Sequence, residues 1–140
     1  MDCVVDLSYA AGWFQPSQKH PEGVRLFKLH LSGEVRLICP SLWFYEVLNL
    51  LATGVRRGTL SEEQADAGLD LLNALEIQAA ELSSDAQRKR VHRFARQFKL
   101  SAYDAAYLEL ADRLQTPLLT RDDELIAAAR QRNLSVTLQK

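Results

Sequence analysis

The chain has 140 residues, of which 47% are hydrophobic and 25% are charged. These values lie near the average of globular domains and exclude a disordered, collagen-like or disulfide-scaffold protein. The formal net charge is −1, which as a total argues against a protein that holds nucleic acid by bulk positive charge. The length predicts one domain over residues 1–140.

Cysteine and histidine usage bears on the compartment and on metal chemistry. Cys3 and Cys39 lie in short apolar runs, which is typical of small buried side chains in a reduced cytoplasmic protein. The three histidines are scattered and do not have the spacing of zinc ligands. No signal peptide is evident, and no stretch approaches the roughly 20 apolar residues that span a bilayer. We therefore expect a cytoplasmic protein with no membrane partner.

Short apolar runs alternate with helical segments along the chain. The β-like runs are Val4-Val5, Val35–Cys39, Ile77–Ala79, Pro117–Leu119 and Val136–Leu138. The helical segments are Ser8–Phe14, Pro21–Leu31, Ser41–Arg57, Glu62–Ala74, Ser84–Gln97, Tyr103–Leu114 and Asp123–Arg132. This alternation predicts an α/β domain whose mainly parallel sheet is covered on both faces. In such folds the ligand crevice lies at the carboxyl ends of the strands.

Four carboxylates stand where a parallel sheet would bring them together. Asp6 and Asp122 each follow a predicted strand, whereas Glu46 and Asp104 lie early in predicted helices. Four such groups in one crevice would repel one another and resist ionisation unless a cation neutralised them. Oxygen ligands without histidine or cysteine select Mg²⁺ or Mn²⁺, the usual apparatus of phosphoryl chemistry.

Each carboxylate also has a purely structural interpretation. Asp6 suits a helix N-cap, Ser101 with Asp104 has the spacing of a capping box, and Thr120 could cap the next helix with Asp123 as its partner. Glu46 shares one helical stripe with Asn49, Thr53 and Arg57. Apolar residues border this stripe, which indicates a groove wall, although an ordinary solvated stripe is the alternative. A separate polar face on the helix of Asp104 comprises Glu109, Asp112 and Arg113.

Four segments, in this order and at these separations, carry a resemblance to a known family. They are Val4-Val5-Asp6-Leu7-Ser8, Pro40-Ser41-Leu42 with Glu46-Val47-Leu48-Asn49, Leu100–Tyr107, and Pro117–Asp122. The chain resembles the PIN-domain ribonucleases, specifically the short toxins of the VapC type. The resemblance implies a PIN-like α/β/α sandwich with a mainly parallel central sheet of about five strands. It also implies an endoribonuclease that depends on Mg²⁺ or Mn²⁺, forms a homodimer and is inhibited by a small antitoxin.

The resemblance also assigns roles to individual residues. The catalytic acids and metal ligands of the family fall on Asp6, Glu46, Asp104 and Asp122, with Asp123 as the alternative for the fourth acid. The family's small hydroxyl near the metal falls on Ser8 and its threonine on Thr120, and we count Asn49 and Asp123 as further supporting candidates. The expected reaction is hydrolysis of RNA phosphodiesters by metal-activated water, with one or two metal ions. A catalytically silent PIN-like interaction domain is the alternative function. Two positions depart from the family's usual glycine, namely Gln115 and Asn133.

The positive charge is concentrated in one segment. Residues 86–100 carry +6 and contain no acid, so the remaining residues sum to −7. Apolar residues of this segment fall on one helical stripe, which predicts an amphipathic helix docked by its apolar face. Arg93 and Arg96 on its polar side, and Arg56 and Arg57 elsewhere, are candidate contacts to RNA or to an acidic antitoxin segment. An ordinary solvated basic face is the third interpretation.

Overall fold

The computed structural model describes residues 1–138, in which strands and helices alternate. The strands are β1 (Asp2–Val5), β2 (Arg36–Pro40), β3 (Gln78–Ala80) and β4 (Leu118–Leu119). The α-helices are α1 (Leu7–Ala10), α2 (Pro21–Leu31), α3 (Leu42–Arg57), α4 (Glu62–Ala74), α5 (Asp85–Phe98), α6 (Ala102–Leu114) and α7 (Asp123–Gln131). Two short 3-10 helices, η1 (Ala11–Trp13) and η2 (Pro16–Gln18), follow α1. None of the described helices is both long and apolar enough to cross a membrane.

All pairs of neighbouring strands are parallel, and the strand order is β3-β2-β1-β4. The chain moves outward from β1 to β2 and β3, and then returns to place β4 on the other side of β1. The direction of winding therefore reverses between β1 and β4. In open parallel sheets this reversal separates the loops that leave neighbouring strands, and the opening it creates at their carboxyl ends is the usual ligand crevice.

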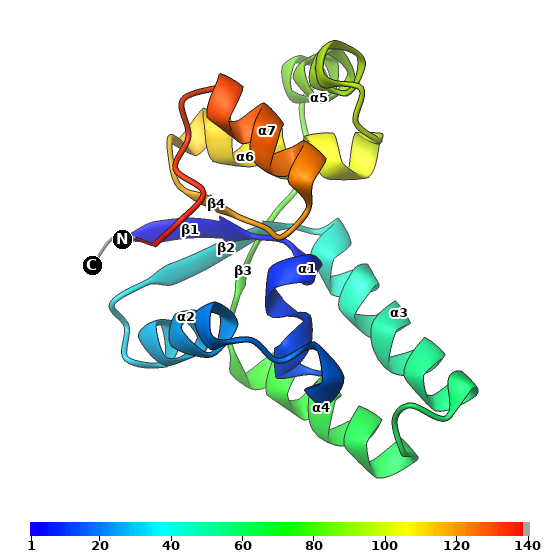
Figure 1. Cartoon of the computed structure of the whole chain (residues 1–140). Helices are drawn as coiled ribbons and strands as arrows, with labels where there is room; N and C mark the ends of the chain where they lie inside the picture. The colour runs from blue at the N-terminus through cyan, green and yellow to red at the C-terminus, as the bar shows by residue number, and fades with distance from the viewer. Residues whose placement is uncertain (139–140) are drawn as a thin grey trace.

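The helices form a layer on each side of the sheet. Figure 1 shows α6 and α7 over one face of the sheet, with α1, α2 and α4 on the other side. Cys3, Val4 and Val5 of β1 are fully buried, as the continuous apolar run predicts for a central strand. Helix α6 lies against the sheet, α5 and α7, and seven of its residues are buried. The predicted α/β/α architecture is confirmed.

Some predicted elements differ from the structure. The predicted strand over Val136–Leu138 does not form, so the described chain has four strands rather than about five. The Ser135 hydroxyl donates to the Thr137 carbonyl and accepts from the Thr137 amide, and this local turn replaces a ladder with β4. The predicted helix Ser8–Phe14 is split into α1 and η1. β3 is an edge strand whose Gln78 and Ala79 are exposed, so it is not covered on both faces.

The two positions that depart from the family's glycine both adopt left-handed backbone. Gln115 has φ +52° and Asn133 has φ +60°. Gln115 ends α6, and its side-chain amide donates to the Asp112 carbonyl at 2.6 Å. The same carbonyl also accepts from the Gln115 backbone amide, so the side-chain bond is a second one to it and offsets part of the cost of the left-handed conformation.

Candidate functional site

Asp6 stands at the carboxyl end of β1, at the edge where the winding reverses, and is 7% exposed. Both of its carboxylate oxygens are held: Ser8 Oγ donates to one at 2.6 Å and Thr120 Oγ1 donates to the other at 2.6 Å. The Tyr9 amide also donates to Asp6, so the predicted N-cap role is confirmed. Burial raises the pKa of Asp6 above its usual value, and the charge of Asp104 raises it further, whereas these three hydrogen bonds lower it.

The segment after β4 completes this edge. Thr120 is buried and accepts a hydrogen bond from the Asp122 amide at 3.1 Å, while the Arg121 amide donates to Ser8 Oγ at 2.8 Å. Asp122, rather than Thr120, caps α7, by accepting from the Leu125 amide at 2.9 Å. The predicted pairing of Thr120 with Asp123 as a helix cap is therefore wrong. Thr120 instead ties the end of β4 to Asp6.

Glu46 comes from the second turn of α3 and faces α6. The Tyr107 hydroxyl donates to Glu46 Oε1, which links the two helices. Burial raises the pKa of Glu46, and the charges of Asp6 and Asp104 raise it further, whereas the Tyr107 bond lowers it. Burial and the neighbouring carboxylate also raise the pKa of the Tyr107 phenol, so this group stays protonated and remains a donor. Tyr107 was not predicted as a site residue. Its place one turn after Asp104 on an apolar helix could have indicated that it faces the same side as Asp104.

Asp104 stands in the first turn of α6, and its amide donates to the Ser101 hydroxyl at 3.1 Å. Burial raises the pKa of Asp104, and the nearby charges of Asp122 and Glu124 raise it further. Glu124 is a second residue near the site that was not predicted from the sequence. Asp122 and Asp123, the alternative fourth acid, are both exposed, but it is the charge of Asp122 that raises the pKa of Asp104.

These couplings indicate that the carboxylates lie near one another at the carboxyl edge of the sheet. Among residues 1–138, no three Asp, Glu, His or Cys side chains are arranged so that they could hold a metal ion by themselves. Mg²⁺ keeps several of its waters and uses one or two carboxylates, so a complete protein cage is not required. The donors are all hard oxygens and no arginine or lysine pairs with the four acids in the described chain. The residues therefore fit a hydrated Mg²⁺ or Mn²⁺ ion.

The predicted stripe on α3 does line a pocket. Asn49, Thr53 and Arg57 form one wall of a pocket of about 450 Å³ that begins one turn beyond Glu46. Gln15, Gln18 and Thr59 stand across it. The groove interpretation is thus supported over that of a plain solvated stripe. Arg56, the adjacent cation, is exposed and does not line this pocket.

The basic segment forms α5, which docks through buried Val91 and Phe94 as predicted. Arg93 and Arg96 are exposed on its outer side. Arg90 instead points inward and donates to Asp112 at 2.9 Å, with its Nε 3.5 Å from Glu109.

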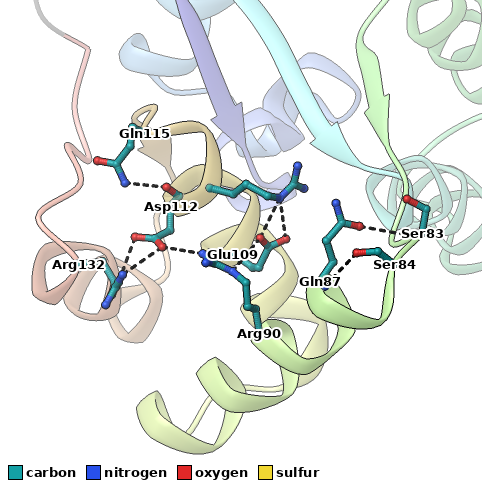
Figure 2. Close-up of polar contacts among 9 residues, drawn as sticks. Ser83, Ser84, Gln87, Arg90, Glu109, Asp112, Gln115 and Arg132 are labelled. Atoms are coloured by element: carbon teal, nitrogen blue, oxygen red, sulfur yellow. Dashed lines mark hydrogen bonds and ion pairs between the residues drawn. The ribbon is translucent and has the colours of Figure 1, made fainter.

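The polar face predicted on the helix of Asp104 is not solvated. Glu109 is 2% exposed and Asp112 is 6% exposed, because α5 and α7 cover this side of α6. Arg113 donates to Glu109 at 2.9 Å, and Arg132 from α7 donates to Asp112 at 3.0 Å. Figure 2 shows Arg90 reaching between the two carboxylates while Arg132 meets Asp112 from the other side.

Comparisons of the sequence and of the fold with known proteins identify a family and several relatives. Residues 4–131 match the model of the PIN domain family. The chain is 34% identical over 132 residues to Ribonuclease VapC3 of Pyrobaculum aerophilum, covering 89% of this chain and 92% of the relative. The crystal structure of PAE2754 from the same organism superposes with a TM-score of 0.70 at 24% identity, covering 91% of this chain and 79% of the other. VapBC2 from Rickettsia felis, solved bound to a DNA fragment from their promoter, gives a TM-score of 0.69 at 14% identity, covering 97% of each chain.

Proposed function

Because the chain belongs to the PIN domain family, we propose that it is a metal-dependent endoribonuclease that hydrolyses RNA phosphodiesters. We further propose that it is the toxin of a toxin–antitoxin pair, a role supported by its similarity to Ribonuclease VapC3 and to the VapBC2 structure. The observation that carries the proposal is the group of four acids at the winding reversal, which pair with no described lysine or arginine. Within this group the charge of Asp104 raises the pKa of Asp6 and of Glu46.

In this proposal each residue has a definite task. Asp6, Asp104 and Asp122 would hold the divalent ion directly or through its waters, and Glu46 would orient the attacking water or hold a second ion. Ser8 and Thr120 fix the orientation of the Asp6 carboxylate, and Tyr107 fixes that of Glu46. When bound, the ion lowers the pKa of water and stabilises the charge that develops on the phosphate.

Cationic and apolar surfaces of the chain are the proposed contact sites for RNA and for the antitoxin. Arg57, which lines the polar pocket beside α3, is proposed to contact the RNA phosphates together with the exposed Arg93 and Arg96. An apolar groove of about 540 Å³ between α2, η1 and α4 is proposed to receive a helix of the antitoxin. Trp13, Phe27 and Leu71 line this groove, and Lys19 and Lys28 stand at its edge, so an amphipathic segment with acidic flanks fits it. The homodimer stays a prediction that light scattering would test.

Asp104→Asn tests the proposal, because it keeps the shape of the side chain and removes its charge. The purified parent and variant are incubated with total cellular RNA and Mg²⁺ or Mn²⁺, and the new RNA ends are mapped by sequencing. We expect the parent to cut and a chelator to stop it. The variant should cut at least about 100-fold more slowly, a loss typical of removing a preorganised catalytic charge.

Asp66→Asn is the matched control, since Asp66 is exposed on α4 and outside the crevice. It should cut RNA at the parent's rate. Equal cleavage by the Asp104→Asn variant and the parent would contradict the assignment of the site. A parent that neither cuts RNA nor gains thermal stability from Mn²⁺ would favour the alternative of a silent PIN-like interaction domain.

A further inference from the structure

We propose that the polar pocket beside α3 is a nucleotide-recognition subsite, which binds one unpaired base of the RNA and its phosphate a few nucleotides from the scissile bond. This inference rests on the proposed ribonuclease function and assigns it a determinant of cleavage sequence. The pocket has a volume of about 450 Å³, within the range of small-molecule sites.

The position of the pocket follows from helical geometry. Glu46, Asn49, Thr53 and Arg57 recur every three or four residues, so they lie along one stripe of α3. Asn49 lies roughly 5 Å and Arg57 roughly 17 Å along the helix axis from Glu46, at about 1.5 Å per residue. A polynucleotide bound at the carboxylates therefore meets the pocket within its next nucleotides.

The opposite wall comes from the segment after α1 and from the loop after α3. Gln15 Nε2 donates to Thr59 Oγ1 at 3.2 Å, and Thr59 Oγ1 donates to the Gly54 carbonyl at 3.3 Å. These bonds fix the positions of Gln15 and Thr59, and they leave the side-chain oxygen Oε1 of Gln15 free to accept a hydrogen bond. Asn49 and Gln18 are exposed, so their amides can exchange water for a ligand at small desolvation cost.

The lining favours a base with an attached phosphate over other ligands. Amide side chains offer a donor and an acceptor together, which matches the edge of a nucleobase. Arg57 is the single charged residue in the lining, and a guanidinium can pair with two oxygens of one phosphate. An apolar antitoxin helix is a poor match, because most of the lining side chains are polar, in contrast to the groove between α2 and α4.

Arg57→Gln and Arg56→Gln form the main test, because these neighbouring cations differ in whether they line the pocket. Cleavage of total RNA is mapped for both, and binding of a fluorescent single-stranded RNA pool is measured in the Asp104→Asn background. We expect Arg57→Gln to weaken RNA binding about tenfold more than Arg56→Gln does. Gln18→Leu should broaden the base preference near the cut, whereas Gln131→Leu, an exposed amide at the end of α7, should leave it as in the parent.

The outcomes separate this inference from the proposed function. If the parent cuts RNA but the two arginine variants bind RNA equally and Gln18→Leu preserves the base preference, the pocket is not a subsite while the nuclease stands. If the pocket variants change inhibition by the antitoxin and leave RNA binding and cleavage unaltered, the pocket belongs to the protein partner and the inference fails. If the parent neither cuts nor binds RNA, the proposed function and the subsite fail together.

Discussion

Helix α6 carries two sets of carboxylates whose surroundings are opposite. At its start, Asp104 faces the crevice with Asp6, Glu46 and Asp122, and no described arginine or lysine pairs with any of them. Toward its end, Glu109 and Asp112 are buried between α5 and α7 and are bound by Arg90, Arg113 and Arg132. The same residue type thus serves two purposes on one helix.

The difference lies in where the neutralising charge comes from. The second set is neutralised within the chain, so it fastens α5 and α7 to α6 and needs no external ion. The first set has only hydroxyl, phenol and amide partners, and the charges of Asp6 and Asp104 raise the pKa of Glu46. It is therefore less stable alone and gains most from an added cation. Removing charge should have opposite effects on stability at the two ends of α6.

The largest effect is expected at the internally paired end. Asp112→Asn leaves Arg132 without its carboxylate and Arg90 with only the longer contact to Glu109, so we expect the free energy of unfolding to fall by about 3 kcal/mol in urea titrations. Both guanidinium groups are partly exposed, which places the effect near the lower end for a broken buried pair. Asp70→Asn, at an exposed position of α4, is the control and should change little. A fall no larger than in this control would show that the network does not stabilise the fold.

The next effect concerns metal binding at the crevice. Mn²⁺ at about 100 times its dissociation constant should stabilise the parent by about 2.7 kcal/mol, because the ion binds only the folded chain. The variant Asp104→Asn should lose most of this gain, and Asp112→Asn should keep it despite its lower starting stability. Differential scanning calorimetry with Mn²⁺ or with chelator measures both. A similar Mn²⁺ response in the Asp104→Asn variant would place the ion elsewhere.

Tyr107→Phe removes a neutral hydrogen-bond partner of Glu46, so it tests how far such partners stabilise the unpaired set of carboxylates. The phenol is 1% exposed and donates to Glu46, so its loss should lower the free energy of unfolding by about 2 kcal/mol in chelator. Tyr103→Phe, at a phenol that is 69% exposed, serves as the control. Equal stability of the two variants would mean that the Glu46 bond contributes nothing to the fold.

The smallest effect has the opposite sign and depends on pH. The folded-state pKa of Glu46 is raised above its usual 4.5, so its stabilising contribution is complete below pH 4.5 and is lost as pH rises through the raised value. In chelator at pH 7, Glu46→Gln should therefore be more stable than the parent by about 1 kcal/mol. The advantage should disappear near pH 4, where the parent's carboxyl is protonated. Urea unfolding at the two pH values tests this, and an advantage that is equal at both would refute the charge explanation.

Much of this arrangement could be predicted from the sequence, because strands and helix starts set where the four acids stand. Asp6 follows an apolar run and Asp122 follows another, so the parallel sheet places both at its carboxyl edge. The polar stripe on α3 could also be predicted, because its residues recur every three or four positions along one helix. That residues 1–140 form one domain stays a prediction.

Contacts that depend on packing between distant helices could not be predicted. Tyr107 and Glu46 are 61 positions apart, and their bond depends on how α3 and α6 approach one another. Glu109 and Asp112 look solvated in sequence because their spacing gives a polar face, and only the docking of α5 and α7 buries them. The missing strand over Val136–Leu138 reflects a local serine turn that competes with the weak β preference of three residues.

The hydrogen bond from Thr120 to Asp6 joins residues near opposite ends of the chain, since the two are 114 positions apart. A chain that is still being synthesised can fold β1, β2 and α3 early, but it lacks Thr120 and Asp122 until nearly all residues have been added. The hydrogen bond from the Thr120 hydroxyl to Asp6 forms only when β4 pairs with β1. The carboxylates that are proposed to bind the metal ion are therefore brought together only when translation is almost complete.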